Sequence, residues 1–248
     1  MDFLRDRVAL VTGGSRGIGE AIVRTLCGAG AEVVLHYNRG EKEARKIASE
    51  TGHCLCVRAD LEDASSVEGL WSEAVGWRGR IDVLVNNAGI YEPVSVEDGG
   101  RWEEVWQRTL GINLISAADL CRKAILHFRE RGGGTIINVA SRAAFRGDDP
   151  EYMPYAASKG GMVSLTRTIA RGFAREGILA YTVAPGFVET EMAREFVRRG
   201  GGDPAREIPL GSLAPPQEVA NVVAFLASGA VRHATGATID INGASYVH

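Results

Sequence analysis

The sequence predicts an α/β fold in which one doubly wound, parallel sheet of seven strands carries helices on both faces. Short runs of β-branched residues alternate along the chain with longer helical stretches, which is the pattern of repeated βαβ units. Most of the strand-like runs are apolar throughout, as expected for strands that are covered on both sides. The length of 248 residues suits one α/β domain, so we expect a single domain over residues 1–248.

The strands are expected where the short apolar runs occur, at residues 8–12, 32–37, 54–58, 83–86, 135–139, 180–183 and 237–241. The helices are expected in the longer stretches between them, at residues 18–29, 41–50, 64–77, 101–131, 155–176 and 216–228. The fourth helical stretch is the longest, and Gly111 is expected to mark a bend or a junction between two helices.

One connection, residues 185–215, is much longer than the others. It contains a short helical piece at residues 190–199 and three glycines at residues 200–202. A long connection in a compact domain is usually a mobile or functional segment. We therefore expect residues 187–207 to form a lid over a ligand site. Three apolar side chains are available to cover the substrate: Phe187, Met192 and Phe196.

The composition excludes several classes of protein. The chain is 45% hydrophobic and 24% charged, as globular proteins are, and its net charge of −3 lacks the basic excess of a general nucleic-acid binder. No apolar run reaches the roughly 18 residues of a membrane helix, and no secretion signal is recognisable, so we expect a cytoplasmic protein without a membrane partner. Neither the five histidines nor the cysteines show metal-ligand spacing. The cysteines are expected to be buried, reduced thiols: Cys27, Cys54, Cys56 and Cys121.

A glycine-rich loop, residues 13–19, stands between the first expected strand and the first expected helix. Its glycines let the backbone turn tightly and approach a pyrophosphate, while the helix N-terminus offers free N–H groups to that anion. This placement indicates a Rossmann-type dinucleotide site. The residues expected to form it are Gly13, Ser15, Arg16, Gly17, Ile18 and Gly19.

The same loop also fits the G-x-S-x-G elbow of serine hydrolases, and Gly132–Gly134 imitates an oxyanion-hole motif. An elbow follows several strands, whereas this loop follows the first one. We therefore interpret the loop as a dinucleotide-binding loop rather than as the nucleophile elbow of a hydrolase.

The end of the second strand indicates which cofactor is bound. An acidic side chain usually holds a free adenosine ribose at this point, and none is present. The strand is followed instead by Asn38 and Arg39, and Arg16 stands in the glycine-rich loop. Because guanidinium groups bind phosphate and a carboxylate would repel it, we expect NADP(H).

Tyr155 and Lys159 form the expected catalytic pair. Residues four apart on a helix share a face, so the phenol and the ammonium group converge on one site. A phenol with a pKa near 10 exchanges protons poorly at neutral pH unless a cation favours its phenolate. We expect Lys159 to lower the pKa of Tyr155.

Over nearly its whole length the sequence resembles the short-chain dehydrogenase/reductase family. The matching pieces are residues 12–19, Asp60, residues 86–89, Asn113, Ser141, Tyr155 with Lys159, Pro185-Gly186 and Thr190. The resemblance implies that Ser141 binds the substrate oxygen, that Tyr155 exchanges its proton, and that Asn113 holds a water in a relay to Lys159. It also implies a cofactor contact for Asp60, Leu61, Asn87, Ala88, Gly89, Tyr155, Lys159, Pro185, Gly186, Val188 and Thr190.

Within that family the chain is most similar to bacterial 3-oxoacyl-[acyl-carrier-protein] reductases, which implies an acyl-thioester substrate and acyl carrier protein as a possible partner. Two arginines that help those enzymes to bind the carrier are replaced by Gly132 and Glu176, with Arg131 and Arg175 one residue away. The last strand ends in residues 242–244 as Asn-Gly-Ala, where Asp-Gly-Gly is common.

Alternatives therefore remain open: a reductase of another small ketone or sugar-like alcohol, or a catalytically silent NADP-binding regulator. The helices at residues 101–131 and 155–176 resemble those through which the family forms homodimers and homotetramers.

Overall fold

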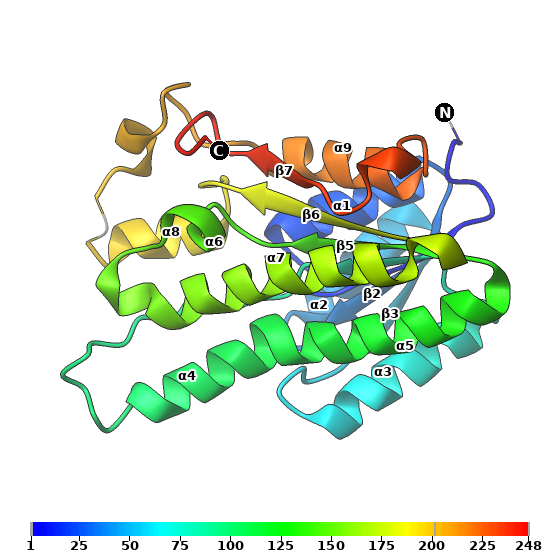
Figure 1. The fold of residues 1–248 in the computed structure, drawn as a ribbon, viewed down its shortest axis with the longest axis horizontal. Coiled ribbons are helices and arrows are strands. Elements are labelled where there is room, and N and C mark those ends of the chain that lie inside the picture. Colours follow the sequence, from blue (N-terminus) through cyan, green and yellow to red (C-terminus); the bar gives the residue numbers. More distant parts are fainter. Residues whose placement is uncertain (1, 201, 248) are drawn as a thin grey trace.

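The computed structural model describes residues 2–200 and 202–247; Met1, the lid glycine Gly201 and His248 lie outside the described residues. Within these ranges one parallel sheet of seven strands has the order β3-β2-β1-β4-β5-β6-β7 (Figure 1). The predicted doubly wound α/β sheet is confirmed. The strands are β1 (Val8–Val11), β2 (Glu32–Tyr37), β3 (Cys54–Arg58), β4 (Val83–Asn86), β5 (Gly134–Val139), β6 (Ile178–Pro185) and β7 (Thr238–Ile241).

The α-helices of the described residues are α1 (Gly17–Gly28), α2 (Glu41–Thr51), α3 (Ala64–Arg78), α4 (Trp102–Leu110), α5 (Ser116–Arg131), α6 (Ala143–Arg146), α7 (Met153–Phe173), α8 (Glu191–Arg198) and α9 (Pro216–Ala227). A π-helix, Gly111–Ile115, joins α4 to α5. Short 3-10 turns are Pro150–Tyr152, Ala174–Glu176, Pro204–Glu207 and Arg232–Ala234.

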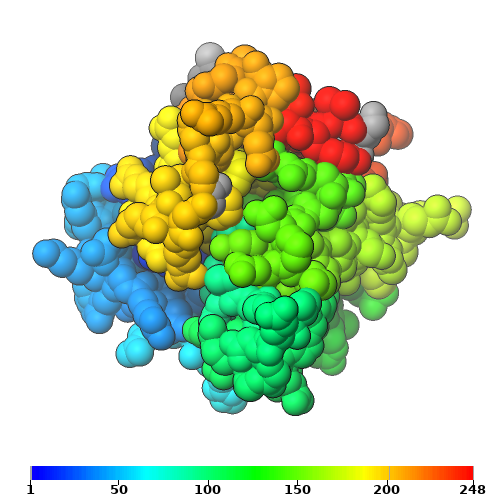
Figure 2. Space-filling view, turned by 90° about the vertical axis from the view of Figure 1, so that its left-hand side faces the viewer, coloured from blue at the N-terminus to red at the C-terminus, as the bar shows by residue number. Residues whose placement is uncertain are grey.

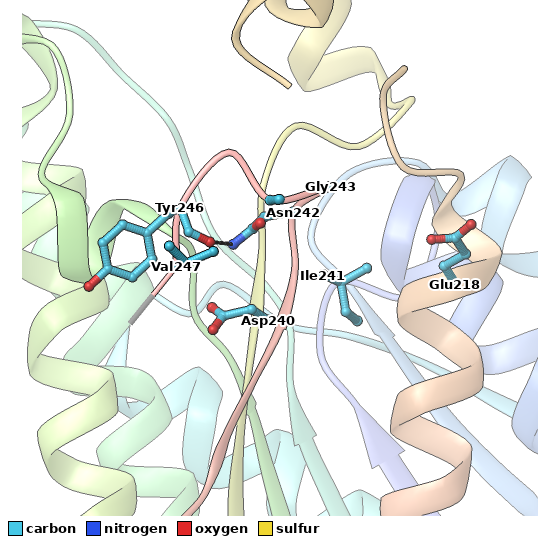
Figure 3. Close-up of a pocket in the computed structure, with 8 residues that line it drawn as sticks. Glu218, Asp240, Ile241, Asn242, Gly243, Tyr246 and Val247 are labelled. Atoms are coloured by element: carbon cyan, nitrogen blue, oxygen red, sulfur yellow. Dashed lines mark hydrogen bonds between the residues drawn. The ribbon is translucent and has the colours of Figure 1, made fainter. Parts of the chain in front are cut away.

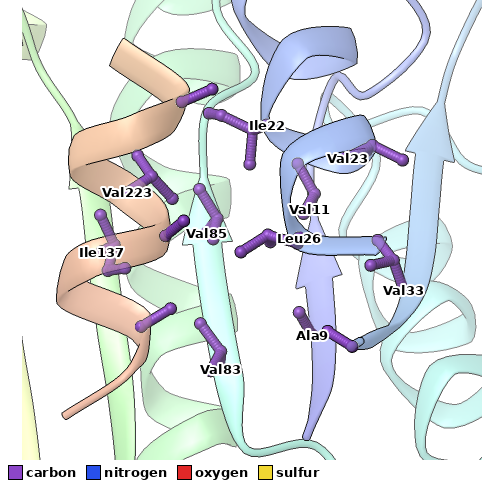
Figure 4. Close-up of a cluster of buried hydrophobic side chains, with 14 of the residues drawn as sticks. Ala9, Val11, Ile22, Val23, Leu26, Val33, Val83, Val85, Ile137 and Val223 are labelled. Carbon is purple, nitrogen blue, oxygen red and sulfur yellow. The ribbon is translucent and has the colours of Figure 1, made fainter. Parts of the chain in front are cut away.

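Helices cover both faces of the sheet because successive residues of a strand point to opposite sides. In β1, Ala9 and Val11 belong to the core beneath α1 and α9, whereas Val8 and Leu10 belong to the core beneath α3, α5 and α7. Figure 4 shows the first of these cores, in which side chains of α1 and α9 lie over the strands: Ile22, Val23, Leu26 and Val223. Most strands are thus apolar on both faces, as the sequence predicts, whereas β7 places Ile239 and Ile241 on one face and the polar Thr238 and Asp240 on the other.

The strand order places a crevice at the carboxyl ends of β1 and β4. From β1 the chain winds towards β2 and β3, and β4 then pairs with the other side of β1. Open α/β sheets bind ligands at the point where the winding direction reverses. The glycine-rich loop follows β1 and residues 87–89 follow β4, so both lie at this crevice.

The long helix predicted at residues 101–131 is an unbroken rod of α4, the π-helix and α5 (Figure 1). The predicted junction at Gly111 is confirmed, since the π-helix begins there. The helix predicted at residues 155–176 begins earlier, at Met153, because Pro154 fits a first turn, where no N–H donor is needed. It ends at Phe173, and a 3-10 turn then leads to Gly177, whose φ of 78° stops the helical backbone.

The sequence does not predict the helix α6 or the turn Pro204–Glu207, since four residues are too few to show a helical period. It also predicts β6 too short. The strand starts at Ile178, which pairs with Gly134 of β5, and it ends at Pro185, which pairs with Ile241 of β7. Pairing on both sides extends it beyond its most apolar residues.

The predicted lid, residues 187–207, contains α8 and lies at the carboxyl-end side of the sheet (Figure 1). Its first residues are fixed by a parallel bridge between Val188 and Ala214. Phe196 is buried on α8, and Ile208 is buried just after the segment. The lid is therefore held at its start by backbone pairing, in its middle by the buried Phe196 and at its end by the buried Ile208.

Among the described residues no helix is long and apolar enough to cross a bilayer, and no cluster of three or more His, Cys, Asp or Glu is arranged to hold a metal ion. The four cysteines are free thiols. Cys27 and Cys121 are buried as predicted, but Cys54 and Cys56 are only partly buried, because β3 is an edge strand of the sheet.

Candidate active site

A cavity of about 1460 Å³ opens at the carboxyl ends of the strands. Figure 2 views the molecule from this side, where the yellow and orange lid segment lies beside the green residues that follow β5. Asn113 is buried behind its wall. The other predicted site residues all line the cavity: Gly13, Ser15, Arg16, Gly17, Ile18, Gly19, Asn38, Arg39, Asp60, Leu61, Asn87, Ala88, Gly89, Ser141, Tyr155, Lys159, Pro185, Gly186, Val188 and Thr190.

Hydrogen bonds tie the glycine-rich loop to the ends of β2 and β4. The Gly13 N–H donates to Nδ1 of His36 at 3.1 Å, and the Asn87 amide donates to the carbonyl oxygens of Thr12 (2.9 Å) and Gly13 (3.2 Å). A Cβ added at Gly19 would lie 2.0 Å from the Gly13 oxygen. The loop therefore admits no side chain there, and its bare backbone leads directly into the N-terminus of α1, where a phosphate finds free N–H groups.

His36 is a part of this cradle that the sequence does not predict. Its ring is buried at the end of β2, and burial lowers its pKa to about 4. The neutral ring accepts from Gly13 through Nδ1, so its Nε2 carries the hydrogen and donates to the Ala59 oxygen at 3.2 Å. It thereby links the loop after β1 to the end of β3.

Two arginines reach the cavity at the end of β2. Arg16 and Arg39 are exposed, and neither forms an ion pair with any residue that the structure describes. The Ser15 hydroxyl donates to the Arg39 carbonyl oxygen at 3.4 Å, which holds the two arginine-bearing loops together. Glu43 also lines this end of the cavity.

The helix α7 places Tyr155 and Lys159 on the wall of the cavity. The Lys159 Nζ lies 5.7 Å from the centre of the Tyr155 ring and donates to the Val139 oxygen at 2.8 Å. Burial raises the pKa of Tyr155 to about 12 and lowers the pKa of Lys159 to about 8. The sequence predicts that Lys159 lowers the pKa of Tyr155. In the structure this pKa is raised instead, because the cost of burying a phenolate outweighs the contacts that favour it.

Ser141 stands at the end of β5, beside Tyr155. Its hydroxyl accepts from the Ala143 N–H at 3.1 Å, which fixes the side chain, and its hydrogen bond to Tyr155 favours the phenolate against the effect of burial. The two hydroxyl groups can thus converge on one oxygen atom of a substrate.

Asn113 lies in the π-helix and connects two segments of the site. Its Oδ1 accepts from the Ile90 N–H at 2.8 Å, while its Nδ2 donates to the Ile90 oxygen (3.0 Å) and to the Ser158 hydroxyl (3.1 Å). Both amide hydrogens are thus used within the protein. Asn113 joins the loop after β4 to α7 next to Lys159; its part in a water relay stays a prediction.

Aromatic rings that the sequence does not single out surround Tyr155. The Tyr91 ring meets the Tyr155 ring edge-on, with 4.7 Å between the ring centres, and stacks on the Tyr152 ring, with 3.8 Å between the ring centres. In the lid, the Phe196 ring packs against the Phe187 ring, with 5.2 Å between the ring centres. The lid residues Phe187, Met192 and Phe196 all line the cavity, as predicted. The substrate end therefore has an apolar, aromatic wall around polar reacting groups.

The hydrolase alternative conflicts with the geometry. Ser15 is buried and its hydroxyl donates to a backbone oxygen, so it is not a nucleophile held by a base. Gly132 ends α5 and Gly134 begins β5, which places this glycine run at the amino ends of the strands, opposite the cavity.

A second hollow of about 470 Å³ lies beside the end of β7 (Figure 3). The Asn242 Nδ2 donates to the Tyr246 oxygen at 3.0 Å and folds the C-terminal segment back over Gly243. None of the predicted catalytic residues lines this hollow.

Comparisons with known proteins cover nearly the whole chain. A family model described as enoyl-(acyl carrier protein) reductase matches residues 13–244. The chain is 36% identical to cis-4-hydroxycyclohexanecarboxylate dehydrogenase of Sinomonas cyclohexanicum over 96% of both chains. It is also 36% identical to 3beta-hydroxysteroid dehydrogenase 1 of Eggerthella lenta, over 98% of this chain and 94% of that one. It is 34% identical to the 3-oxoacyl-[acyl-carrier-protein] reductase of Escherichia coli, over 97% of this chain and 98% of that one.

These relatives differ in the substrates that their names give, but all are named as dehydrogenases or reductases, and each matches this chain over nearly its whole length. The resemblance seen in the sequence is confirmed at the level of the family. The chain belongs to the short-chain dehydrogenase/reductase family, as an oxidoreductase that acts on CH–OH groups with a nicotinamide cofactor.

Proposed function

We propose that this protein transfers hydride between NADP(H) and the carbonyl or alcohol carbon of a small substrate. The observation that carries the proposal is the single cavity that joins the two unpaired arginines at the end of β2 to Ser141, Tyr155 and Lys159. A dinucleotide bound along this cavity would have its adenosine end near the arginines and its nicotinamide end near the hydroxyl pair.

The arginines support NADP(H) over NAD(H). A 2′-phosphate would give Arg16 and Arg39 the anionic partner that no described residue supplies. The glycine cradle fits the pyrophosphate, since its backbone is open where a Cβ at Gly19 would collide with Gly13.

The proton chemistry follows from the hydroxyl pair. The bound cofactor supplies or accepts the hydride. Ser141 donates a hydrogen bond to the carbonyl oxygen, and Tyr155 gives its proton to that oxygen as negative charge develops there. The phenol of Tyr155, whose pKa burial raises to about 12, holds its proton at neutral pH, so its transfer to the substrate needs a neighbouring group that favours the phenolate. The Lys159 ammonium group, buried beside it, favours the phenolate that remains.

Two positions at the amino ends of the strands, away from the cavity, favour a small free ketone over a carrier-bound thioester. Gly132, at one position where carrier-binding reductases have an arginine, has a φ of 79° that disfavours any side chain. Glu176, at the other position, is an acid paired with Arg129. The 3-oxoacyl thioester remains the competing candidate, with acyl carrier protein as its carrier.

The test measures the oxidation of NADPH and NADH with a panel of ketones. The panel contains acetoacetyl thioesters of coenzyme A and of acyl carrier protein, a 3-oxosteroid, and 4-oxocyclohexanecarboxylate. We expect NADPH-dependent turnover of at least one free ketone and a lower kcat/KM for the carrier-bound thioester. Absence of NADPH-dependent turnover with every ketone would contradict the proposal.

The matched variants are Tyr155→Phe and Tyr181→Phe. Tyr155→Phe keeps the ring against Tyr91 but removes the proton donor, so turnover should fall by roughly 10²–10⁴-fold. Tyr181→Phe removes a hydroxyl that binds the Val231 oxygen outside the cavity, so turnover should stay near the parent level. Near-normal activity in Tyr155→Phe would refute the role of the phenol.

A further inference from the structure

Arg142, the residue after Ser141, is a buried cation with an unused hydrogen-bond donor. It is 7% exposed and lines the cavity. Its Nη2 donates to Oε2 of Glu207 at 3.0 Å, whereas its Nη1 is buried and has no hydrogen-bond partner in the described part of the chain. Leaving a buried donor unpaired is unfavourable, and it is more unfavourable for a charged group. Such a group indicates an acceptor that the protein itself does not provide.

The position of the guanidinium group shows where that acceptor belongs. The Arg142 backbone N–H donates to the Pro185 oxygen at 2.9 Å, which fixes the residue between the ends of β5 and β6. Its Cζ lies 4.7 Å from the centre of the Phe187 ring. Ser141 and Phe187 line the same cavity, so the side chain lies at the substrate end rather than at the adenosine end.

A second arginine strengthens the site. Arg146 follows one turn later on α6, and its Nη1 donates to the same Glu207 Oε2 at 3.0 Å. Two guanidinium groups thus share one carboxylate oxygen. Glu207 comes from the lid and its side chain is 54% exposed, while both arginines line the cavity and Glu207 does not. Glu207, which neutralises this arginine pair, is therefore the group that another anion in the cavity can displace.

Two other acids on the cavity wall, Asp148 and Glu195, have partners of their own. Asp148 accepts from the Tyr91 hydroxyl at 3.3 Å and from the Asp149 N–H at 3.0 Å, and burial raises its pKa, which disfavours its charged form beside Arg146. On α8, Glu195 binds Arg198 and Arg199. None of these contacts satisfies Nη1 of Arg142.

We propose that Arg142, assisted by Arg146, binds a carboxylate carried by the substrate, so that the substrate is an oxo acid or hydroxy acid rather than a neutral ketone. A carboxylate accepts two parallel hydrogen bonds from one guanidinium group, which would use the orphaned Nη1. Glu207 then shares the arginine pair with the substrate or leaves it. This inference rests on the proposed function, because it requires the substrate carbonyl to lie at Ser141 and Tyr155.

The first test compares 4-oxocyclohexanecarboxylate with its methyl ester as substrates in the presence of NADPH. The parent enzyme should show a kcat/KM at least tenfold higher for the acid. Arg142→Gln should lower kcat/KM for the acid at least 30-fold and for the ester less than threefold, so that the preference disappears. Arg167→Gln, an exposed arginine of α7 outside the cavity, should change neither value. Glu207→Gln, which removes the competing charge, should lower KM for the acid and leave the ester unchanged.

Two results would overturn the inference while leaving the proposed function intact: equal use of acid and ester by the parent enzyme, or an equal loss for both substrates in Arg142→Gln. If neither compound is turned over, the proposed function fails for this pair, and calorimetric titration with cyclohexanecarboxylate still tests the site. We expect binding by the parent and at least tenfold weaker binding by Arg142→Gln; no binding by the parent overturns the inference. If Arg142→Gln does not fold, Arg142→Lys takes its place, since it keeps the charge and loses the two-pronged contact.

Discussion

Substitution of Gly19 by alanine tests the fit between α1 and the glycine-rich loop. Gly19 is the third residue of α1, and an added Cβ would lie 2.0 Å from the Gly13 oxygen and 2.6 Å from the Asn87 Nδ2. Real Cβ atoms essentially never approach closer than 3.0 Å, so the helix and the loop must separate by about 1 Å. The obstacle is a backbone carbonyl, which cannot rotate away as a flexible side chain can.

The cost follows from what holds α1 in place. Ile22, Val23 and Leu26 are fully buried on the sheet, so the helix cannot move without opening the core shown in Figure 4. Overpacking of this kind costs about 1–3 kcal/mol, and the better helix propensity of alanine returns up to about 1 kcal/mol. We expect Gly19→Ala to lower the free energy of unfolding by about 2 kcal/mol and to weaken NADPH binding at least tenfold, since the displaced loop carries the phosphate contacts.

The matched control is Gly28→Ala at the other end of the same helix. Gly28 is exposed, and an added Cβ there meets nothing within 4 Å. This change should leave NADPH binding unaltered and stabilise the protein by up to about 1 kcal/mol. Urea unfolding and fluorescence titration with NADPH measure both quantities. An unchanged unfolding free energy in Gly19→Ala would refute the close contact, and a destabilised variant with normal NADPH affinity would refute the phosphate role of the loop.

Four further predictions concern the cofactor, the C-terminal turn, the lid and the assembly. Arg16→Ala and Arg39→Ala should each weaken NADPH binding by about 1–3 kcal/mol and NADH binding much less; a parent enzyme that prefers NADH would contradict this. Ala244 has a φ of 66°, so Ala244→Gly should raise the unfolding free energy by about 0.5–1 kcal/mol in urea titrations, and a loss of stability would count against the strain. Hydrogen exchange over residues 187–207 should slow when NADPH and a ketone analogue bind, as expected for a lid; unchanged exchange would indicate a static wall. Light scattering should give the mass of a dimer or tetramer, and a value near 26.5 kDa would refute assembly.

Much of the fold follows from local sequence signals. The apolar runs identify most strands because these strands are covered by helices on both faces, and the glycine-rich loop identifies the first βα turn. Element ends are less predictable, since they depend on neighbours: Ile178 belongs to β6 because it pairs with Gly134, and nothing local to residue 178 indicates this.

The sequence predicts those parts of the candidate site that the strand order of the sheet brings together. Residues that follow parallel strands meet at one edge of the sheet, so Gly13, Ser141 and Pro185 line one cavity although they are distant in sequence. His36 and Arg142 are not predictable in this way. His36 acts through a hydrogen bond to another strand's loop, and Arg142 is notable only because burial leaves its Nη1 without a partner. Both properties arise from tertiary packing.

The π-helix shows the limit of sequence reasoning at this site, because the sequence predicts a junction at Gly111 but not the kind of helical turn that forms there. Each residue of a regular α-helix turns the next side chain by about 100°, so the wider turn at Gly111–Ile115 changes the direction of every side chain after it relative to α4. That shift points Asn113 inwards, where its amide bonds Ile90 after β4 and Ser158 beside Lys159. An irregular turn of this kind is less favourable than a regular helix and persists where the surrounding contacts compensate. Here the compensation is the set of hydrogen bonds that joins Ser158 of α7 to the loop after β4. The contact between α7 and that loop therefore depends on a helical irregularity that the residues of α4 and α5 alone do not encode.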